Sequence, residues 1–222
     1  MSALVRTLEP EVMDTAEEAI DYDGMDHSAV NARFVADFLA VWNRRSPILD
    51  VGTGTARIPI EFCRQWPTGT LVAIDLSVEM LRVARENVVR AGLSERIDLV
   101  RLNAREMYWP GGTFPAVVSN STIHHIPEPA TAFHEMVRLA CPGATIFVRD
   151  LLRPNSAEEV EGLVESYARD ENEHSRRMFR ESLHASLTLS EVRRLVEAQG
   201  FDPQTAIQTS DRHWTWTASQ LF

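Results

Sequence analysis

The chain has 222 residues, of which 44% are hydrophobic and 24% charged, as is usual for a globular protein. All 22 basic residues are arginine, which excludes three lysine-dependent chemistries: P-loop phosphate binding, Schiff bases with pyridoxal phosphate, and the kinase ion pair. The formal net charge is −10, and most of it comes from residues 1–26, where eight acidic residues stand against one arginine.

The composition also excludes some partners. Because phosphate backbones repel an acidic chain that lacks a basic patch, we expect no nucleic acid partner. No apolar run approaches the ~20 residues that cross a bilayer, and the acidic N-terminus is unlike a targeting signal, so we expect no membrane partner. Cys63 and Cys141 are too few for a disulfide framework or a cysteine-rich zinc site. We predict that both are buried free thiols and that the protein is cytoplasmic.

Apolar strands and amphipathic helices alternate along the first two thirds of the chain. The first predicted helix covers 29–41, and its inner face carries Val30, Phe34, Phe38 and Val41. The elements predicted next are strand 48–51, a helix with Ile58, Phe62 and Trp66, strand 71–74, a helix between Ser77 and Gly92, strand 97–102, strand 116–119, helix 131–140, a turn at 141–143 and strand 145–148. Short, near-continuous apolar strands are typical of a buried parallel sheet.

The pattern changes after residue 150. Two polar helices are predicted at about 156–169 and 174–185, followed by a helix at 190–199 and strand-like segments at 204–209 and 213–218. We therefore predict an α/β fold with a doubly wound, mostly parallel seven-stranded sheet. An N-terminal helical extension precedes this sheet, and a helical insert follows its fifth strand.

A polar residue stands at the end of each of the five core strands: Asp50, Asp75, Asn103, Asn120 and Asp150. Ligands of doubly wound sheets bind at the carboxyl ends of the strands. Any one of these residues could instead be a helix cap or a loop residue. Five of them at one edge of the sheet predict a site for a polar ligand.

The loop after the first strand reads DVGTGTAR (50–57), and its glycines allow the backbone to turn sharply near a ligand. It departs from the dinucleotide fingerprint GxGxxG at Arg57, where a glycine would pack closely against the strand. Asp50 fits a cationic group better than a pyrophosphate. Asp75 is placed to accept hydrogen bonds from a ribose diol. A ligand with a cationic part, a ribose and no phosphate is S-adenosylmethionine.

Four segments carry a family resemblance: LDVGTGTARIPI (49–60), LVAIDLSVEML (71–81), LVRLNAREM (99–107) and FPAVVSNSTIHHIPEP (114–129). Together they resemble the motifs of class I S-adenosylmethionine-dependent methyltransferases of the small-molecule type, which includes the quinone and menaquinone C-methyltransferases. The chain departs from the usual motifs at Ala56, Asn103 and Pro115, where the family often has a glycine and two aspartates. A Rossmann-like methyltransferase fold is implied.

The resemblance implies an enzyme that transfers a methyl group from S-adenosylmethionine to a small-molecule acceptor by in-line displacement. It implies cofactor contacts for Asp50, Gly52, Thr53, Gly54, Asp75, Leu76, Met80, Asn103, Ala104 and Asn120. An amide oxygen at Asn103 can still accept from the adenine amino group. We expect one domain over 1–222, with a pocket-covering extension (1–44), a cofactor-binding core (45–150) and the insert with the C-terminal strands (151–222).

The catalytic candidates are His124, His125 and Tyr22. Both histidines follow Asn120 closely, and a neutral imidazole could take a proton from the acceptor. Alternatively, one histidine packs under the loop while the other meets solvent. In similar proteins a tyrosine before the first helix closes over the cofactor, which is the role implied for Tyr22, although it could simply anchor the extension.

Three further groupings have alternative interpretations. Asp26 and His27 could join His125 and His213 in a polar pocket, but no spacing requires a metal and we expect none. The insert could hold a substrate carboxylate or present a solvated face through Glu173, His174, Arg176, Arg177, Arg180 and His184. Its apolar residues could form a homodimer contact: Leu163, Val164, Met178 and Phe179. Two tryptophans share one face of the last strand, and we expect them to pack against a helix: Trp214 and Trp216.

Two other functions stay open. The chain could bind S-adenosylmethionine without transferring a methyl group, and cofactor binding alone does not separate this function from catalysis. A NAD-dependent oxidoreductase on a similar sheet is a further alternative, against which Asp50 and Arg57 argue. O-, N-, S- and C-methylation all use the same cofactor-binding half, so the motifs do not select among them.

Overall fold

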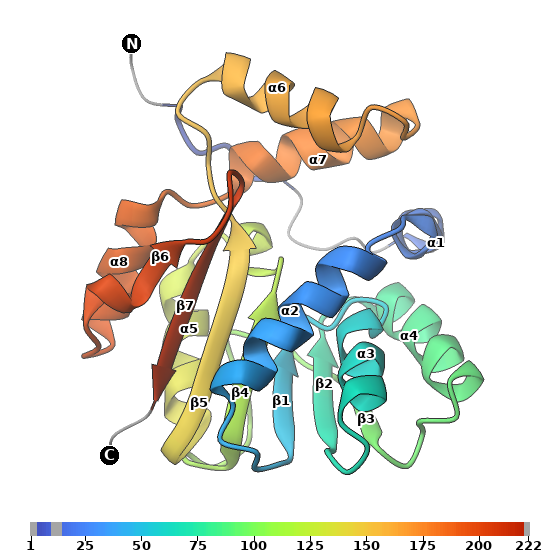
Figure 1. Cartoon of the computed structure of the whole chain (residues 1–222), viewed down its shortest axis with the longest axis vertical. Helices are drawn as coiled ribbons and strands as arrows, with labels where there is room; N and C mark the ends of the chain where they lie inside the picture. The colour runs from blue at the N-terminus through green and yellow to red at the C-terminus, as the bar shows by residue number, and fades with distance from the viewer. Residues whose placement is uncertain (1–3, 10–14, 220–222) are drawn as a thin grey trace.

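The computed structural model describes residues 4–9 and 15–219, and the strands of this part form a seven-stranded sheet (Figure 1). The strands are β1 (Ile48–Val51), β2 (Leu71–Asp75), β3 (Ile97–Arg101), β4 (Phe114–Asn120), β5 (Ala140–Leu151), β6 (Ala206–Gln208) and β7 (His213–Ser219). Their order across the sheet is β3-β2-β1-β4-β5-β7-β6. Strands β1 to β5 pair in parallel, whereas β7 is antiparallel to β5 and β6. The predicted fold class is confirmed.

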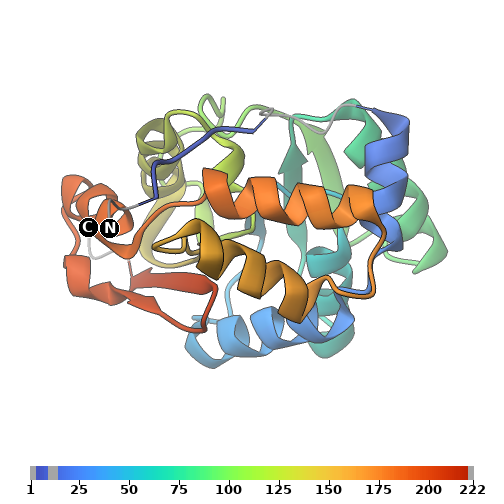
Figure 2. The same ribbon diagram turned by 90° about the horizontal axis from the view of Figure 1, so that it is seen from above.

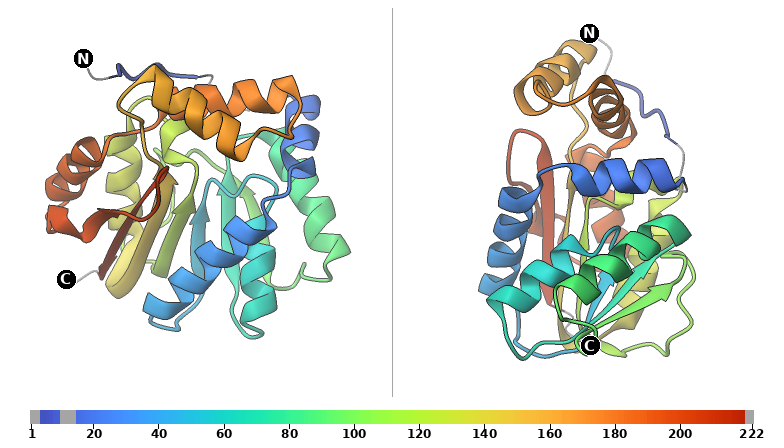
Figure 3. Two further views of the ribbon diagram at one scale, coloured as in Figure 1. Left: turned by 45° about the horizontal axis from the view of Figure 1, so that its top comes forward. Right: turned by 90° about the vertical axis from the view of Figure 1, so that its right-hand side faces the viewer.

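Helices cover both faces of the sheet (Figure 3). They are α1 (Ala16–Gly24), α2 (Ser28–Val41), α3 (Arg57–Gln65), α4 (Val78–Arg90), α5 (Pro129–Leu139), α6 (Ala157–Tyr167), α7 (Glu173–Ala185) and α8 (Leu189–Ala198), with short 3₁₀ turns η1 (Ile123–His125) and η2 (Pro203–Thr205). One apolar core joins the sheet to α5 and α8, and the other joins it to α2, α3 and α4. Trp214 and Trp216 are fully buried in the first core against Phe133, which confirms their predicted packing role.

Local signals in the sequence mark the ends of α4 correctly. The Ser77 hydroxyl accepts from Met80 N at 3.1 Å, and Gly92 adopts a φ of +69° just past the helix. Two details of the prediction were wrong. Val41, the last residue of α2, is exposed, and the next residue, Trp42, fills the core position instead. The segment 141–143 lies within β5 as an irregularity in its pairing with β4, and is not a turn before the strand.

Helices α6 and α7 stand over the carboxyl ends of the parallel strands (Figure 1). They pack on each other through a small apolar cluster that includes Val160, Val164 and Leu183. Val164 is fully buried in this cluster, so the prediction that it forms a dimer contact was wrong. Residues 4–9 run alongside α7 (Figure 2), where Thr7 N donates to the carbonyl of His184 at 3.1 Å.

The remaining predictions about exposure have mixed outcomes. Cys63 is a buried free thiol as predicted, whereas Cys141 is half-buried because it lies at the irregular start of β5. None of the helices in residues 4–9 and 15–219 combines the length and the apolar character that a membrane span requires. Residues 1–3 and 10–14 of the predicted extension (1–44) lie outside the described part.

Candidate active site

The backbone of the loop between β1 and α3 is tightly constrained. Gly52 and Gly54 have φ angles of +76° and +54°, in the left-handed region that favours glycine. The N–H groups of Gly52 and Thr53 both donate to Ile74 O, at 2.9 and 2.8 Å, which ties the loop to the end of β2. A Cβ atom at residue 52 would overlap the Thr122 side chain. Only glycine fits this position without a local rearrangement.

Two backbone N–H groups fix the carboxylate of Asp75 at the end of β2. Its Oδ2 accepts from Gly54 N at 2.8 Å, and its Oδ1 accepts from Ser77 N at 2.9 Å. Burial raises the pKa of Asp75 despite these hydrogen bonds. Each carboxylate oxygen retains capacity for a further hydrogen bond. Two acceptors held in a fixed orientation suit a vicinal diol such as that of a ribose.

The carboxylate of Asp50 is buried beside this loop. The residue is 2% exposed, and its Oδ2 has no hydrogen-bond partner within the described residues. Burial raises the pKa of Asp50 to about 7. An ionised carboxylate in such a position is costly without a counter-charge, and a cationic group beside it would favour the ionised form. The site therefore suits a ligand with a positive charge.

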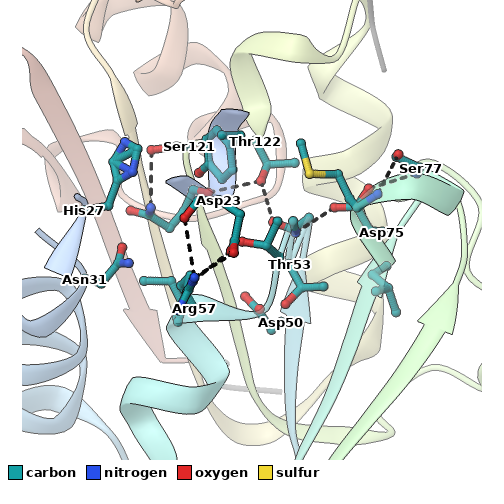
Figure 4. A pocket seen from close by; sticks show the side chains of 18 of the residues that line it. Asp23, His27, Asn31, Asp50, Thr53, Arg57, Asp75, Ser77, Ser121 and Thr122 are labelled. Atoms are coloured by element: carbon teal, nitrogen blue, oxygen red, sulfur yellow. Dashed lines mark hydrogen bonds and ion pairs between the residues drawn. The ribbon is translucent and has the colours of Figure 1, made fainter. Parts of the chain in front are cut away.

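These residues line a cavity of about 450 Å³ at the carboxyl ends of β1, β2 and β4 (Figure 4). Its volume falls within the range of small-molecule and cofactor sites. The structure brings all ten residues of the predicted cofactor set to its wall: Asp50, Gly52, Thr53, Gly54, Asp75, Leu76, Met80, Asn103, Ala104 and Asn120. Their proximity is therefore a structural fact, whereas their contacts with a cofactor stay predictions.

The turn after β4 closes one side of the cavity. Ser121 has a φ of +52°, which is uncommon for a residue other than glycine. Thr122 Oγ1 lies 3.1 Å from Gly52 O and 3.1 Å from Asn120 O, and so links this turn to the glycine loop. Figure 4 shows Thr122 near the loop residue Thr53, and Ser121 on the side of His27. The strained turn and the constrained loop hold each other in place.

Residues 22–28, at the end of α1 and in its link to α2, line the opposite side of the cavity. The ring of Tyr22 faces Gly54 and stacks on His27, with ring centroids 5.3 Å apart. Burial raises the pKa of Tyr22 to about 12, so its hydroxyl is protonated at neutral pH. The Asp23 carboxylate pairs with Arg57, with Oδ2 2.7 Å from Nη2. These contacts attach α1 to α3 across the cavity.

The two candidate histidines occupy different positions relative to the cavity. His125 lines it, whereas His124 lies behind its wall and is 3% exposed. His124 Nδ1 is 2.5 Å from Asp150 Oδ1. Burial opposes protonation of His124, but the charges of Asp150 and Glu9 raise its pKa overall. Burial and the neighbouring His124 lower the pKa of His125 to about 3. Only His125 is placed to meet a ligand in the cavity.

Some predicted groupings do not form in the structure. Asp26 and His27 line the cavity with His125, but His213 does not, because its Nδ1 hydrogen-bonds with Ser210 Oγ at 2.9 Å. The predicted pocket with all four residues was therefore wrong. The Asn103 amide oxygen accepts from the backbone N–H of the residue two positions later at 2.9 Å. Arg105 Nε also lies 3.5 Å from this oxygen, so the oxygen stabilises its own turn, and the predicted adenine contact would compete with the Arg105 side chain.

The arginines of the insert pair with nearby acids. Arg180 Nε lies 2.6 Å from Glu161 Oε1, and Arg176 Nη2 lies 3.3 Å from Glu165 Oε2. Within the described part of the chain, the residues that line the cavity include none from α6 or α7. The arrangement supports a solvated helix face for these arginines. It does not bring them to a substrate carboxylate in this cavity.

Two contacts of the site were not predicted. In the sequence Arg57 marks only a departure from the dinucleotide fingerprint, and its pairing with Asp23 has no local signal. Glu9 is one acid among many in the first residues, yet its side chain lies against both histidines of η1. Each contact joins residues that are far apart in the chain, and no motif or spacing indicates either of them.

Comparisons with known proteins agree with this architecture. The family model for methyltransferase domains matches residues 48–143. The ubiquinone/menaquinone biosynthesis C-methyltransferase of Escherichia fergusonii is 28% identical over 123 residues, which cover 55% of this chain and 49% of that protein. The chain spans about half the length of the curated relatives that it matches.

Solved structures share the fold at low sequence identity. A methyltransferase from Aquifex aeolicus that depends on S-adenosylmethionine superposes with a TM-score of 0.68 and 18% identity, covering 92% of this chain and 98% of that chain. The [4+2]-cyclase SpnF superposes with a TM-score of 0.61 and 14% identity, covering 99% of this chain and 88% of that chain. Residues 48–143 therefore match the methyltransferase domain family, and the solved structures share the fold of the chain. In sequence the chain resembles the ubiquinone/menaquinone C-methyltransferases.

Proposed function

We propose that the chain is an enzyme that transfers a methyl group from S-adenosylmethionine to a small-molecule acceptor. The observation that carries the proposal is the convergence of three features on one cavity: the buried Asp50 carboxylate, the glycine loop and the fixed Asp75 carboxylate. A cationic ligand with a diol and no phosphate satisfies all three. The match of residues 48–143 to methyltransferase domains supports the same cofactor.

The residues around the loop fit this cofactor. Asp50 would balance the positive charge of its methionine part, and Asp75 would accept hydrogen bonds from its ribose hydroxyls. Leu76 and Met80 would pack near the adenine, whose edge would face Asn103. When bound, S-adenosylmethionine supplies an electrophilic methyl group on its sulfonium, and S-adenosylhomocysteine is a good leaving group. The hydrogen bonds that fix the loop and Asp75 are made between protein groups alone, so they hold the site in one geometry, which is the preorganisation that catalysis requires.

We place the acceptor in the part of the cavity lined by α1, α2 and η1. Asn31, His27 and His125 offer polar contacts there. In-line displacement requires the acceptor atom within about 3–3.5 Å of the methyl group, so alignment by these walls can supply much of the rate. Tyr22 would exclude water from the cofactor side, because its ring lies against the glycine loop at Gly54. The stacked Tyr22 and His27 rings give this side of the cavity a flat surface.

The test is turnover with the purified full chain. Labelled S-adenosylmethionine is incubated with metabolite fractions, and both S-adenosylhomocysteine and the labelled product are measured. We expect product formation that depends on one acceptor and falls with Asp75→Ala. Binding of NADH in preference to S-adenosylmethionine, measured by calorimetry, would overturn the proposal.

A second candidate function is S-adenosylmethionine binding without methyl transfer. The specific observation in its favour is that a [4+2]-cyclase shares this fold, so the fold alone does not require transfer. Tight cofactor binding without S-adenosylhomocysteine formation across the whole acceptor panel would favour this candidate. Product formation with any acceptor would eliminate it.

Two properties accompany the proposed function as predictions. We propose a cytoplasmic location, in line with the free thiol at Cys63, and cell fractionation tests it. We propose no nucleic acid partner, which a gel-shift experiment tests. A homodimer is also proposed, although Val164 cannot contribute to its contact, and sedimentation equilibrium tests the assembly state.

A further inference from the structure

Three potential metal ligands meet behind the cavity wall formed by η1. They are Glu9 from the N-terminal segment and the adjacent residues His124 and His125. Glu9 Oε1 lies 3.5 Å from His124 Nε2 and 3.2 Å from His125 Nδ1, and all three donor atoms lie within 4.8 Å of one another. The Glu9 and His124 side chains are each less than 10% exposed. The cluster is therefore compact and largely sheltered from water.

A second carboxylate orients one of these ligands. His124 Nδ1 lies 2.5 Å from Asp150 Oδ1, so that Nε2 points to Glu9. Asp150 is itself held by backbone donors, since its Oδ2 accepts from Ile123 N at 2.5 Å. Metal-bound histidines usually donate their other ring N–H to a carboxylate in this way, which fixes the tautomer. His124 thus has one ring nitrogen, Nε2, available to bind a metal and the other, Nδ1, bonded to a supporting carboxylate.

Two atoms of the cluster are buried without a hydrogen bond. Glu9 Oε1 and His125 Nδ1 have no hydrogen-bond partner in the described part of the molecule, although they lie only 3.2 Å apart. The other oxygen of Glu9 accepts from Ser182 Oγ at 3.2 Å, which leaves Oε1 directed at the histidines. Buried polar atoms are rarely left without a partner. A cation between these atoms would satisfy both.

The N-terminal segment is held at the cluster by contacts that do not involve the three potential metal-ligand atoms. Arg6 Nη2 donates to the carbonyls of His124 and Ile126, each at 3.1 Å, and Arg6 Nε donates to Ala185 O at 2.6 Å. Arg6 therefore brings Glu9 to η1 whether or not a cation is bound. A site whose ligands are positioned in advance loses less conformational entropy when it binds a metal.

We propose that Glu9, His124 and His125 form a binding site for Zn²⁺. Two histidines and a glutamate are an established zinc ligand set. Zinc bonds of about 2.0–2.1 Å in tetrahedral geometry place ligand atoms roughly 3.3–3.4 Å apart, close to the two distances from Glu9 Oε1. Glu9 would supply one negative charge to the cation directly and Asp150 a second through His124, against the positive charge of Arg6, which also acts on His124.

Three protein ligands leave a fourth tetrahedral position for water or another small ligand. Because His125 is both a ligand and part of the cavity wall, zinc would also fix the orientation of that wall. The inference does not depend on the proposed methyl transfer, and metal binding can be measured without turnover.

The experiment measures metal binding to the full chain after treatment with a chelator. Zn²⁺ affinity is determined by competition with a chromophoric chelator, and Co²⁺ is added separately to read the coordination geometry from its visible absorption. We expect one metal ion per chain and an intense, tetrahedral-type Co²⁺ spectrum. Glu9→Gln and His125→Ala should each weaken Zn²⁺ binding at least 100-fold.

The matched controls are His134→Ala, which removes an exposed histidine on α5, and Glu17→Gln, which removes an exposed acid on α1. Both should bind zinc as the original chain does, and circular dichroism should show that all variants are folded. Binding well below one ion per chain, or equal binding by the cluster variants and the controls, would overturn the inference. So would nitrogen chemical shifts that show His124 protonated on both nitrogens in the presence of excess Zn²⁺.

Discussion

The wall of the cavity at the ends of β1 and β2 is held mainly by hydrogen bonds that backbone N–H groups donate, whereas the wall formed by α1 and η1 is joined to distant segments by side chains. On the first wall, Gly52 and Thr53 donate to Ile74, and Gly54 donates to Asp75. On the second wall, the Asp23–Arg57 pair and the Glu9–histidine cluster join segments that are distant in sequence. The first wall is suited to a ligand that is always the same. On the second wall, side chains can be substituted without disturbing the sheet.

This difference separates the two tasks of the proposed enzyme. The same cofactor serves reactions with many different acceptors, so the wall that binds it can be rigid and independent of the rest of the pocket. The acceptor contacts lie on the wall held by side chains, where substitutions alter contacts and leave the backbone path intact. Substitutions on the first wall should therefore have larger effects on cofactor binding than substitutions on the second.

The largest effect is expected for Gly52→Ala. A methyl group at this position would overlap Thr122, and alanine would have to adopt a φ of +76°. Overpacking costs about 1–3 kcal/mol and left-handed strain about 1–2 kcal/mol, so we expect S-adenosylmethionine affinity to fall about 100-fold or more. Calorimetry measures the affinity, and circular dichroism checks that the variant is folded.

Gly24→Ala is the matched control for this substitution. Gly24 lines the same cavity on the second wall, but a Cβ atom there would meet nothing within 4 Å. Its affinity for S-adenosylmethionine should stay within about twofold of the original value, since nothing is displaced. Equal losses in the two variants would show that the walls do not differ in rigidity.

Asp75→Ala should have the next largest effect. It removes two fixed acceptors and leaves Gly54 N without its hydrogen bond. Hydrogen bonds to a charged group contribute about 1.5–3 kcal/mol, so affinity should fall roughly 10- to 100-fold. Asp98→Ala, which removes an exposed acid from β3, is the control. Unchanged affinity of Asp75→Ala in calorimetry would refute the ribose assignment.

The two walls also differ in how far sequence alone predicts them. Asp50, the glycines and the Ser77 cap depend on neighbours within a few residues, so local spacing indicates them. The strand ends gather at one edge because parallel topology requires it. The Glu9 contact depends on how the N-terminal segment crosses η1, and no local pattern encodes that path. The sequence offers the alternative that one histidine packs under the loop, but no local pattern indicates that His124 is the one behind the wall and His125 the one on it.

Asp50 gives the first wall a pH dependence. Its pKa of about 7 in the free protein means that a cationic ligand must bind the ionised form and displace a proton at lower pH. Affinity for S-adenosylmethionine should therefore rise up to tenfold per unit as pH increases toward 7 and level off above it. Asp50→Asn should bind weakly with little pH dependence in this range. Calorimetry between pH 5.5 and 8.5 measures both, and a rise that persists in Asp50→Asn would assign it to another group.

The same residue makes an opposite prediction for the stability of the free protein. Folding raises the pKa of Asp50, so the stabilising effect of its neutral form is complete below the unfolded value near 4 and is lost as pH rises to about 7. Across this window, the Asp50 contribution to the free energy of unfolding should fall by up to about 1.4 kcal/mol per pH unit. Chemical denaturation at several pH values, carried out on the original chain and on Asp50→Asn, isolates this contribution. If the free energy of unfolding changed equally with pH in the two proteins, Asp50 would not titrate in this window.

The smallest effect is expected on the second wall, for Arg57→Ala. Arg57 pairs with Asp23 at 2.7 Å, but its side chain is 44% exposed, and such pairs contribute at most about 1 kcal/mol. Loosening α1 should weaken S-adenosylmethionine binding about threefold to fivefold, with a smaller loss at high salt. Arg169→Ala breaks the exposed Arg169–Glu165 pair on the insert, away from the cavity, and should leave affinity unchanged. A loss for Arg57→Ala as large as that for Gly52→Ala would mean that the two walls are equally rigid, because closure of α1 would then contribute as much to binding as the glycine loop.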